Sequence, residues 1–196
     1  MIMKNIKSVC VYCGHNNGDE LYETVAHDVG VALASAKLEL VYGGGKLGLM
    51  GIIADAVVNN GGRAVGFMPH HLNQFEGAHT GIQELHLVDT MHTRKLKMSE
   101  RADAFIVLPG GFGTLDELFE IITWKQLMLH DKPILIVNAY NYWSKLVELM
   151  YHVVDMKFAL PEHRTIFSVV ASVEDVVPAL HASKKPEKEG FMSQVV

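Results

Sequence analysis

The chain has 196 residues, of which 49% are hydrophobic and 20% charged, and its formal net charge at pH 7 is −5. Its length and composition fit one globular domain with a well-buried core, and its scattered basic residues argue against DNA, RNA or an anionic membrane as the main partner. With no apolar run of roughly 18 residues and no signal-peptide pattern at the start, we expect a cytoplasmic protein that binds a small ligand.

Short β-branched runs alternate along the chain with longer segments of helical period, which is typical of repeated βαβ units. The expected strands are Ser8 to Tyr12, Glu39 to Tyr42, Arg63 to Met68, Glu84 to Val88, Ala104 to Leu108, Ile134 to Val137 and Ile166 to Val170. The expected helices are Glu20 to Ala36, Leu49 to Asn60, Met91 to Ala102, Leu115 to His130, Tyr142 to Met156 and Val173 to Ala182. This pattern predicts a single α/β domain over residues 1–182, a doubly wound, Rossmann-like parallel sheet of about seven strands with helices on both faces. Residues 183–196 are polar and charged, so we expect a flexible C-terminal tail.

The cysteines and histidines offer no recognisable metal or redox site. Cys10 and Cys13 lie in one apolar run, and residues three apart on a strand point to opposite faces, so we predict ordinary buried thiols. The adjacent His70 and His71 diverge on any regular element, and no other histidine pair has metal-ligand spacing. We therefore expect neither a metal ion nor a cofactor.

A first glycine loop follows the second expected strand. Gly43, Gly45 and Gly48 formally match the Gly-x-Gly-x-x-Gly pattern of dinucleotide sites. The match is weak, because residues 67–69 are apolar where such a site needs an acid for the ribose. Gly43, Gly44 and Gly45 are candidates for ligand contact, and the alternative is that glycines merely allow close packing of helix and strand.

A second glycine loop runs from Pro109 to Thr114, between the fifth expected strand and a helix. Exposed backbone N–H groups and the positive end of the helix dipole would form a phosphate cradle from Pro109, Gly110, Gly111, Gly113 and Thr114. The loop lacks the lysine and the spacing of a Walker loop, which disfavours nucleoside triphosphate hydrolysis. Two glycine loops at strand ends of one sheet imply a shared crevice.

Three carboxylates, Asp116, Glu117 and Glu120, follow the second loop on one side of the expected helix. Beside a phosphate cradle they suit cleavage of a glycosidic bond, where a carboxylate stabilises positive charge on the sugar or deprotonates water. Thr114 and Glu117 also have the spacing of a capping box, so a structural role for Glu117 is equally compatible with the sequence.

The segment from Met91 to Met98 supplies the cations that the acidic helix lacks, including Arg94 and Lys95. Arg94 is the candidate for orienting the substrate or Glu117, because its planar guanidinium pairs well with carboxylate or phosphate. The alternative is a solvated basic helix face.

Four motifs together resemble the Lonely Guy family of cytokinin-activating phosphoribohydrolases, long mislabelled lysine decarboxylases. They are Val9-Cys-Val-Tyr-Cys-Gly14, Tyr42-Gly-Gly-Gly45 with Gly48-Leu-Met-Gly51, Met91-His-Thr-Arg-Lys95, and Pro109-Gly-Gly-Phe-Gly-Thr-Leu-Asp-Glu117. The resemblance extends from about Ser8 to about Leu180. After Gly14 the family commonly has serine where this chain has His15, which leaves the ligand contacts of that loop open.

The resemblance implies hydrolysis of the N-glycosidic bond of an N6-modified adenosine 5′-monophosphate, or of AMP, to free base and ribose 5-phosphate. It implies Arg94 and Glu117 as the catalytic pair and a homodimer whose site lies near the interface. We expect Met91, Lys95, Asp116 and Glu120 to be substrate-binding residues. A non-catalytic nucleotide or molybdenum-cofactor carrier on the same sheet is the alternative. A lysine decarboxylase would need pyridoxal phosphate and its partner residues, which the sequence does not display.

Overall fold

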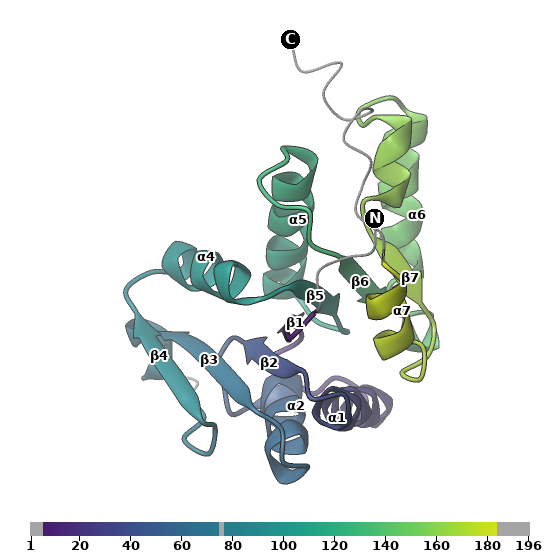
Figure 1. The fold of residues 1–196 in the computed structure, drawn as a ribbon. Coiled ribbons are helices and arrows are strands. Elements are labelled where there is room, and N and C mark those ends of the chain that lie inside the picture. The colour runs from purple at the N-terminus through teal and green to yellow at the C-terminus, as the bar shows by residue number, and fades with distance from the viewer. Residues whose placement is uncertain (1–5, 75–76, 184–196) are drawn as a thin grey trace.

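The computed structural model describes residues 6–74 and 77–183, so most of the expected tail, residues 184–196, lies outside the described residues. Seven strands alternate with helices along these residues (Figure 1). The strands are β1 (Ser8–Tyr12), β2 (Glu39–Tyr42), β3 (Ala64–Pro69), β4 (Glu84–Val88), β5 (Ala104–Val107), β6 (Ile134–Val137) and β7 (Ser168–Val170). The helices are α1 (Glu20–Ser35), α2 (Gly48–Asn59), α3 (His70–Asn73), α4 (Met91–Arg101), α5 (Phe112–Gln126), α6 (Ser144–Asp155) and α7 (Val176–Ala182), with 3₁₀ turns η1 (Ala139–Asn141) and η2 (Pro161–Thr165).

The strands form one parallel sheet in the order β4-β3-β2-β1-β5-β6-β7. From β1 the chain adds strands first on one side, through β4, and then returns to add β5 on the other. The strand order therefore reverses between β1 and β5, and in such sheets ligands bind beyond the carboxyl ends of the strands at that point. The predicted doubly wound, Rossmann-like fold is confirmed.

Two hydrophobic layers enclose the sheet, with α1 and α2 on one side and α4 and α5 on the other (Figure 1). Cys10 packs in the layer with α4 and α5, whereas Cys13 packs in the layer with α1 and α2. Both cysteines are buried free thiols, as the strand periodicity predicts.

The largest error in the predicted elements concerns α5, which begins at Phe112 and not at Leu115, and ends at Gln126 and not at His130. Glycine has low helix propensity, and this conceals the first helical turn within the glycine loop. At the other end, Met128 adopts a left-handed φ of 60°, which terminates the helix. The short α3, η1 and η2 were not predicted, because each is too short to show a hydrophobic period.

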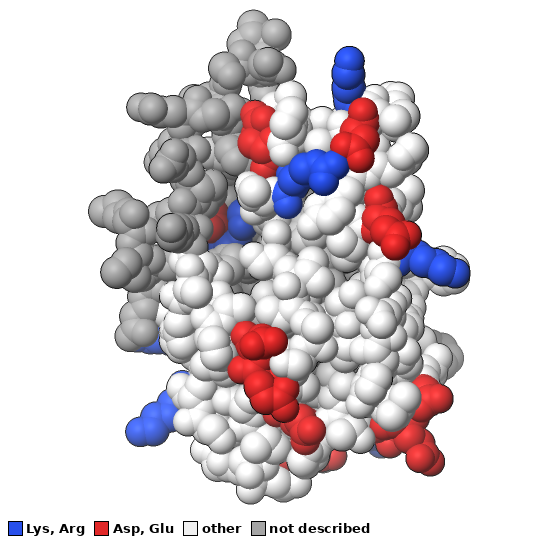
Figure 2. Space-filling view, turned by 90° about the vertical axis from the view of Figure 1, so that its right-hand side faces the viewer, with Lys and Arg blue, Asp and Glu red and all other residues white. Residues whose placement is uncertain are grey.

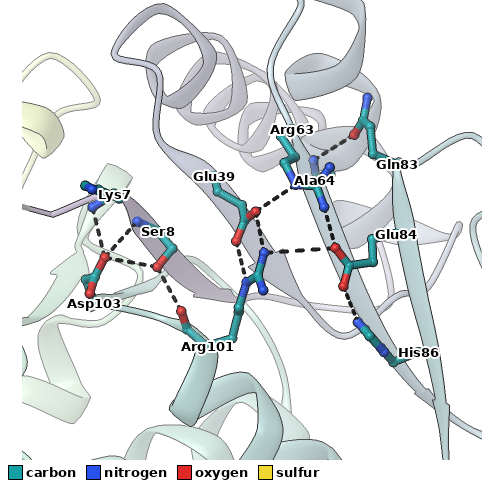
Figure 3. A network of polar contacts seen from close by, with 10 residues as sticks. All are labelled: Lys7, Ser8, Glu39, Arg63, Ala64, Gln83, Glu84, His86, Arg101 and Asp103. Carbon is teal, nitrogen blue, oxygen red and sulfur yellow. Dashed lines mark hydrogen bonds and ion pairs between the residues drawn. The ribbon is translucent and has the colours of Figure 1, made fainter.

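An ion-pair network joins the amino ends of the strands, at the edge opposite the candidate crevice (Figure 3). Glu39 at the start of β2 accepts hydrogen bonds from Arg101 Nε at 2.7 Å and from Arg63 Nε at 2.8 Å. These arginines hold the pKa of the Glu39 carboxyl below its usual value. Arg63 also binds Glu84 at the start of β4. Through Arg101, the network therefore fixes the end of α4 to the sheet at the amino ends of the strands.

The molecular face that includes α6, β7 and α7 carries acidic and basic side chains interspersed among neutral ones (Figure 2). Among the described residues visible on this face, Figure 2 shows no continuous basic surface. Within residues 6–74 and 77–183, no helix combines the length and the apolar character that crossing a membrane requires.

Candidate active site

The loops that follow β1 and β5 meet at the switch point of the sheet. The Gly14 N–H donates a hydrogen bond to the Pro109 carbonyl at 3.0 Å, which fixes the two loops against each other. Beside them lies a cavity of about 400 Å³, and a second cavity of about 220 Å³ adjoins it. Both cavities are lined by Gly14, His15, Asn16 and Gly111. The crevice expected from the two glycine loops is therefore present.

The phosphate cradle predicted from the sequence corresponds to the first turn of α5. Gly111 is the N-cap residue and makes no side-chain cap hydrogen bond, and the first N–H groups of a helix have no partner within it. Gly111, Gly113 and Thr114 line the larger cavity. A Cβ on Gly110 would lie 2.1 Å from Thr114 Oγ1, so this close packing requires glycine.

The capping-box interpretation of Thr114 and Glu117 is wrong. The helix starts two residues before Thr114, so Thr114 is inside its first turn and does not occupy the N-cap position. Both side chains are buried, and Glu117 lines the larger cavity. Glu117 is therefore available to a ligand.

Arg94 is buried, so the alternative that it belongs to a solvated basic helix face is wrong for this residue. Its partners in the structure are weak. Only 6% of Arg94 is exposed. Its Nη2 donates to the Gly43 carbonyl at 3.2 Å, and the sulfur atoms of Met91 and Met50 lie 3.8 and 3.9 Å from the guanidinium nitrogens. Within the described residues its Nε has no hydrogen-bond partner, and no carboxylate lies within 4.0 Å of its nitrogens. An unpaired buried charge facing a cavity is suited to an anionic or electron-rich ligand.

Glu117 projects from α5 into the same cavity. It is 8% exposed, and burial raises the pKa of its carboxyl from 4.5 to about 7. The positive charge of Arg94 opposes this rise, whereas the charge of Asp116 adds to it. A carboxyl group with a pKa near neutrality is suited to exchanging protons with a substrate.

Lys95, next to Arg94 on α4, is buried and paired. Its Nζ lies 2.9 Å from Asp116 Oδ2 and 3.2 Å from Glu120 Oε1. Lys95 and Glu120 do not line either cavity, whereas Asp116 lies at the edge of the larger one. The cations missing from the first turns of α5 are thus supplied by α4, as the sequence suggested.

Four of the other predicted ligand-contact residues divide between the two cavities. Gly43 and Met91 line the larger cavity, and Pro109 and Gly110 line the smaller one. Gly44 and Gly45 line neither. They hold the segment before β4, where the His79 N–H donates to the Gly44 carbonyl at 2.9 Å. Of the three glycines predicted to contact the ligand, only Gly43 lines one of the two cavities, and Gly44 and Gly45 bind the backbone of residues 78 and 79 instead.

Several cavity residues were not predicted from the sequence. Met50, Leu72 and Phe112 supply apolar wall to the larger cavity. Tyr142 lines the smaller one, and its hydroxyl donates to the Gly110 carbonyl at 2.7 Å. No local pattern marks Tyr142, because it reaches the loop only through η1, where Tyr140 and Asn141 adopt left-handed φ angles of 53° and 63°.

The loop that departs from the resembled family, His15 to Gly18, lies between the two cavities and is exposed. Its backbone packs on the first glycine loop, since a Cβ on Gly48 would lie 2.1 Å from the His15 carbonyl oxygen. Among the described residues, no group of three or more His, Cys, Asp or Glu side chains is arranged to hold a metal ion.

Comparisons with known proteins agree on one family. Residues 50–180 match the family model described as "Possible lysine decarboxylase". The chain is 39% identical to a cytokinin riboside 5′-monophosphate phosphoribohydrolase of Arabidopsis thaliana, with 99% of this chain and 94% of that protein aligned. It is 42% identical to the enzyme of the same name from Rhodococcoides fascians, with 90% of each chain aligned.

Solved structures with the same fold include molybdenum cofactor proteins. The carrier protein of Chlamydomonas reinhardtii has a TM-score of 0.66 at 15% identity, covering 88% of this chain and 94% of that one. The binding protein of Rippkaea orientalis has a TM-score of 0.67 at 16% identity, covering 91% and 96%. At such low identity these likenesses show the fold alone. The sequence matches, which span nearly the whole chain, show that it belongs to the Lonely Guy family of cytokinin riboside 5′-monophosphate phosphoribohydrolases.

Proposed function

We propose that the protein hydrolyses the N-glycosidic bond of an adenosine 5′-monophosphate, with or without an N6 substituent, and releases free base and ribose 5-phosphate. The observation that carries this proposal is that buried Arg94 and buried Glu117 line one cavity beside the first turn of α5. The family's phosphoribohydrolases are named for the same chemistry.

The 5′-phosphate would bind at the start of α5. Here the unpaired N–H groups of the first turn and the helix dipole favour an anion, and the Thr114 hydroxyl is close by. Glu117 lies one helical turn further along α5, so a nucleotide anchored by its phosphate would bring its ribose toward Glu117. Met50, Leu72 and Met91 would provide apolar contact for the base.

Glu117 would act as the general base. As the C1′–N9 bond breaks, its electron pair leaves with the base and positive charge develops on the ribose, which an ionised carboxylate stabilises. A water molecule attacks C1′ and gives a proton to Glu117, which later returns it to solvent. The departing base takes up a proton at nitrogen from solvent. Arg94 cannot supply that proton at neutral pH, so its role is to donate hydrogen bonds to the substrate and to favour ionised Glu117.

The assay is release of free base from AMP and from a panel of N6-modified adenosine monophosphates, followed by chromatography. This panel also tests whether unmodified AMP is a substrate, as in an AMP nucleosidase. We expect release by the wild-type protein and loss of at least about a hundredfold in kcat for Arg94→Ala. A folded wild-type protein that releases no base from any member of the panel would refute the proposal.

A homodimer with the site near its interface belongs to the same proposal. Phe112, at the rim of the larger cavity, is 90% exposed, and Phe119, further along α5, is also exposed. Covering such side chains with a second copy would remove apolar surface from water. Light scattering coupled to size exclusion should give twice the monomer mass, and a monomer with full activity would argue against this part of the proposal.

A carrier that binds nucleotide without turnover is the alternative, and its support is the fold shared with molybdenum cofactor proteins. It predicts that AMP raises the unfolding temperature while no base appears. The 39% identity to a phosphoribohydrolase, against 15% to a carrier, favours the hydrolase.

A further inference from the structure

Helices α4 and α5 face each other with adjacent cations on one and three carboxylates on the other, yet the pairing between them is unequal. Lys95 contacts two carboxylates, Asp116 at 2.9 Å and Glu120 at 3.2 Å. Arg94, the preceding residue, has within the described part of the chain only a carbonyl and two sulfur atoms as partners. The carboxylate that remains without an ion pair in this array is Glu117.

We propose that Lys95 is a positioning residue, which binds Asp116 and Glu120 and thereby keeps Arg94 and Glu117 free for the ligand. The inference rests on the proposed function for the roles of Arg94 and Glu117. It assigns to Lys95 a task distinct from ligand contact, consistent with its absence from the walls of both cavities.

Because Lys95 is more buried than its two partners, it depends on Asp116 and Glu120 to balance its charge. The Lys95 side chain is 7% exposed, whereas those of Asp116 and Glu120 are 61% and 23% exposed. A buried ammonium left without its carboxylates would be costly, so Lys95 is held in place by them. Conversely, without Lys95 the two carboxylates would face Arg94 as the neighbouring cation on α4. Arg94 would then leave the Gly43 carbonyl, to which it now donates at 3.2 Å.

Lys95 also controls the charge around Glu117. The carboxylates of Asp116 and Glu120 raise the pKa of Glu117, and the charges of Lys95 and Arg94 lower it. From β1 and the loop after it, the neighbouring titratable groups are those of Cys10, Tyr12 and Cys13. Burial raises their pKa values, so they stay uncharged near neutral pH. His15 of the same loop lines the cavity. Loss of Lys95 therefore removes one positive charge from beside the three carboxylates and draws Arg94 toward Asp116 and Glu120. Both effects should shift the titration of Glu117 to higher pH.

The experiment follows Glu117 directly, by NMR of protein labelled with ¹³C at the glutamate carboxyls, with Glu117→Gln to assign the signal. In Lys95→Met the Glu117 midpoint should rise by about one pH unit, and kcat/KM for AMP at pH 7 should fall about tenfold or more. Lys95→Arg keeps the charge and should keep the midpoint.

The double variant Asp116→Asn/Glu120→Gln removes the two carboxylates and keeps Lys95, so the Glu117 midpoint should fall below that of the wild type. This variant also keeps the test open if Lys95→Met fails to fold. Unchanged Glu117 midpoints in folded Lys95→Met or in the double variant would overturn the proposal. Absence of base release by the wild-type protein would instead refute the proposed function, because the NMR titration does not depend on turnover.

Discussion

Replacing Glu117 with glutamine should stabilise the protein at neutral and alkaline pH while abolishing base release. Burial raises the pKa of Glu117 from 4.5 to about 7, so between these values the folded state binds a proton that the unfolded state has lost. The contribution of this group to stability is thus fully present below pH 4.5 and is lost as the pH rises through about 7. At 1.36 kcal/mol per pKa unit, the loss amounts to ~3 kcal/mol at pH 8.

Glutamine has nearly the same shape and does not ionise, so the difference in unfolding free energy between the variant and the wild type isolates this effect. Urea unfolding at several pH values should show the difference growing by ~3 kcal/mol between pH 4.5 and pH 8. In thermal unfolding this corresponds to about 6 to 12 °C for a chain of this size. A difference that stays constant over this pH range would show that Glu117 has an ordinary pKa in the folded protein. Glu117 would then not be tuned to act as a base near neutral pH.

Three further substitutions separate the site from the scaffold. Gly43→Ala places a methyl group 1.7 Å from Arg94 Nη2, so it should displace the guanidinium and reduce kcat about as far as Arg94→Ala does. Circular dichroism of the variant checks that the fold is kept. Tyr142→Phe removes the hydrogen bond to the Gly110 carbonyl and should raise KM for AMP several-fold with little change in kcat. A fall in kcat as large as the rise in KM would contradict a role of Tyr142 in supporting the loop that binds the phosphate. Arg101→Ala disrupts the network at the amino edge, where the side chain is 43% exposed, so it should lower the unfolding free energy by ~1 kcal/mol and leave KM unchanged.

Hydrophobic period and glycine placement predicted the seven strands and the six longer helices in their sequence along the chain, because these signals are local. They also located both glycine loops at strand ends. The errors at α5 have a local cause as well, since glycines at the start of a helix resemble a loop in sequence.

Sequence patterns alone predicted the doubly wound sheet and singled out Arg94, Glu117 and the glycine loop from Pro109 to Thr114. The sequence left open whether Glu117 caps its helix or lines a cavity, and whether Arg94 is buried or solvated, and the folded structure answers both questions. The folded structure also decided that Lys95 pairs with Asp116, 21 residues away, and that Tyr142 supports Gly110, 32 residues away. Burial and ion pairing depend on contacts between segments distant in the chain. These contacts set the pKa of Glu117 and, among the described residues, leave Arg94 without a carboxylate partner.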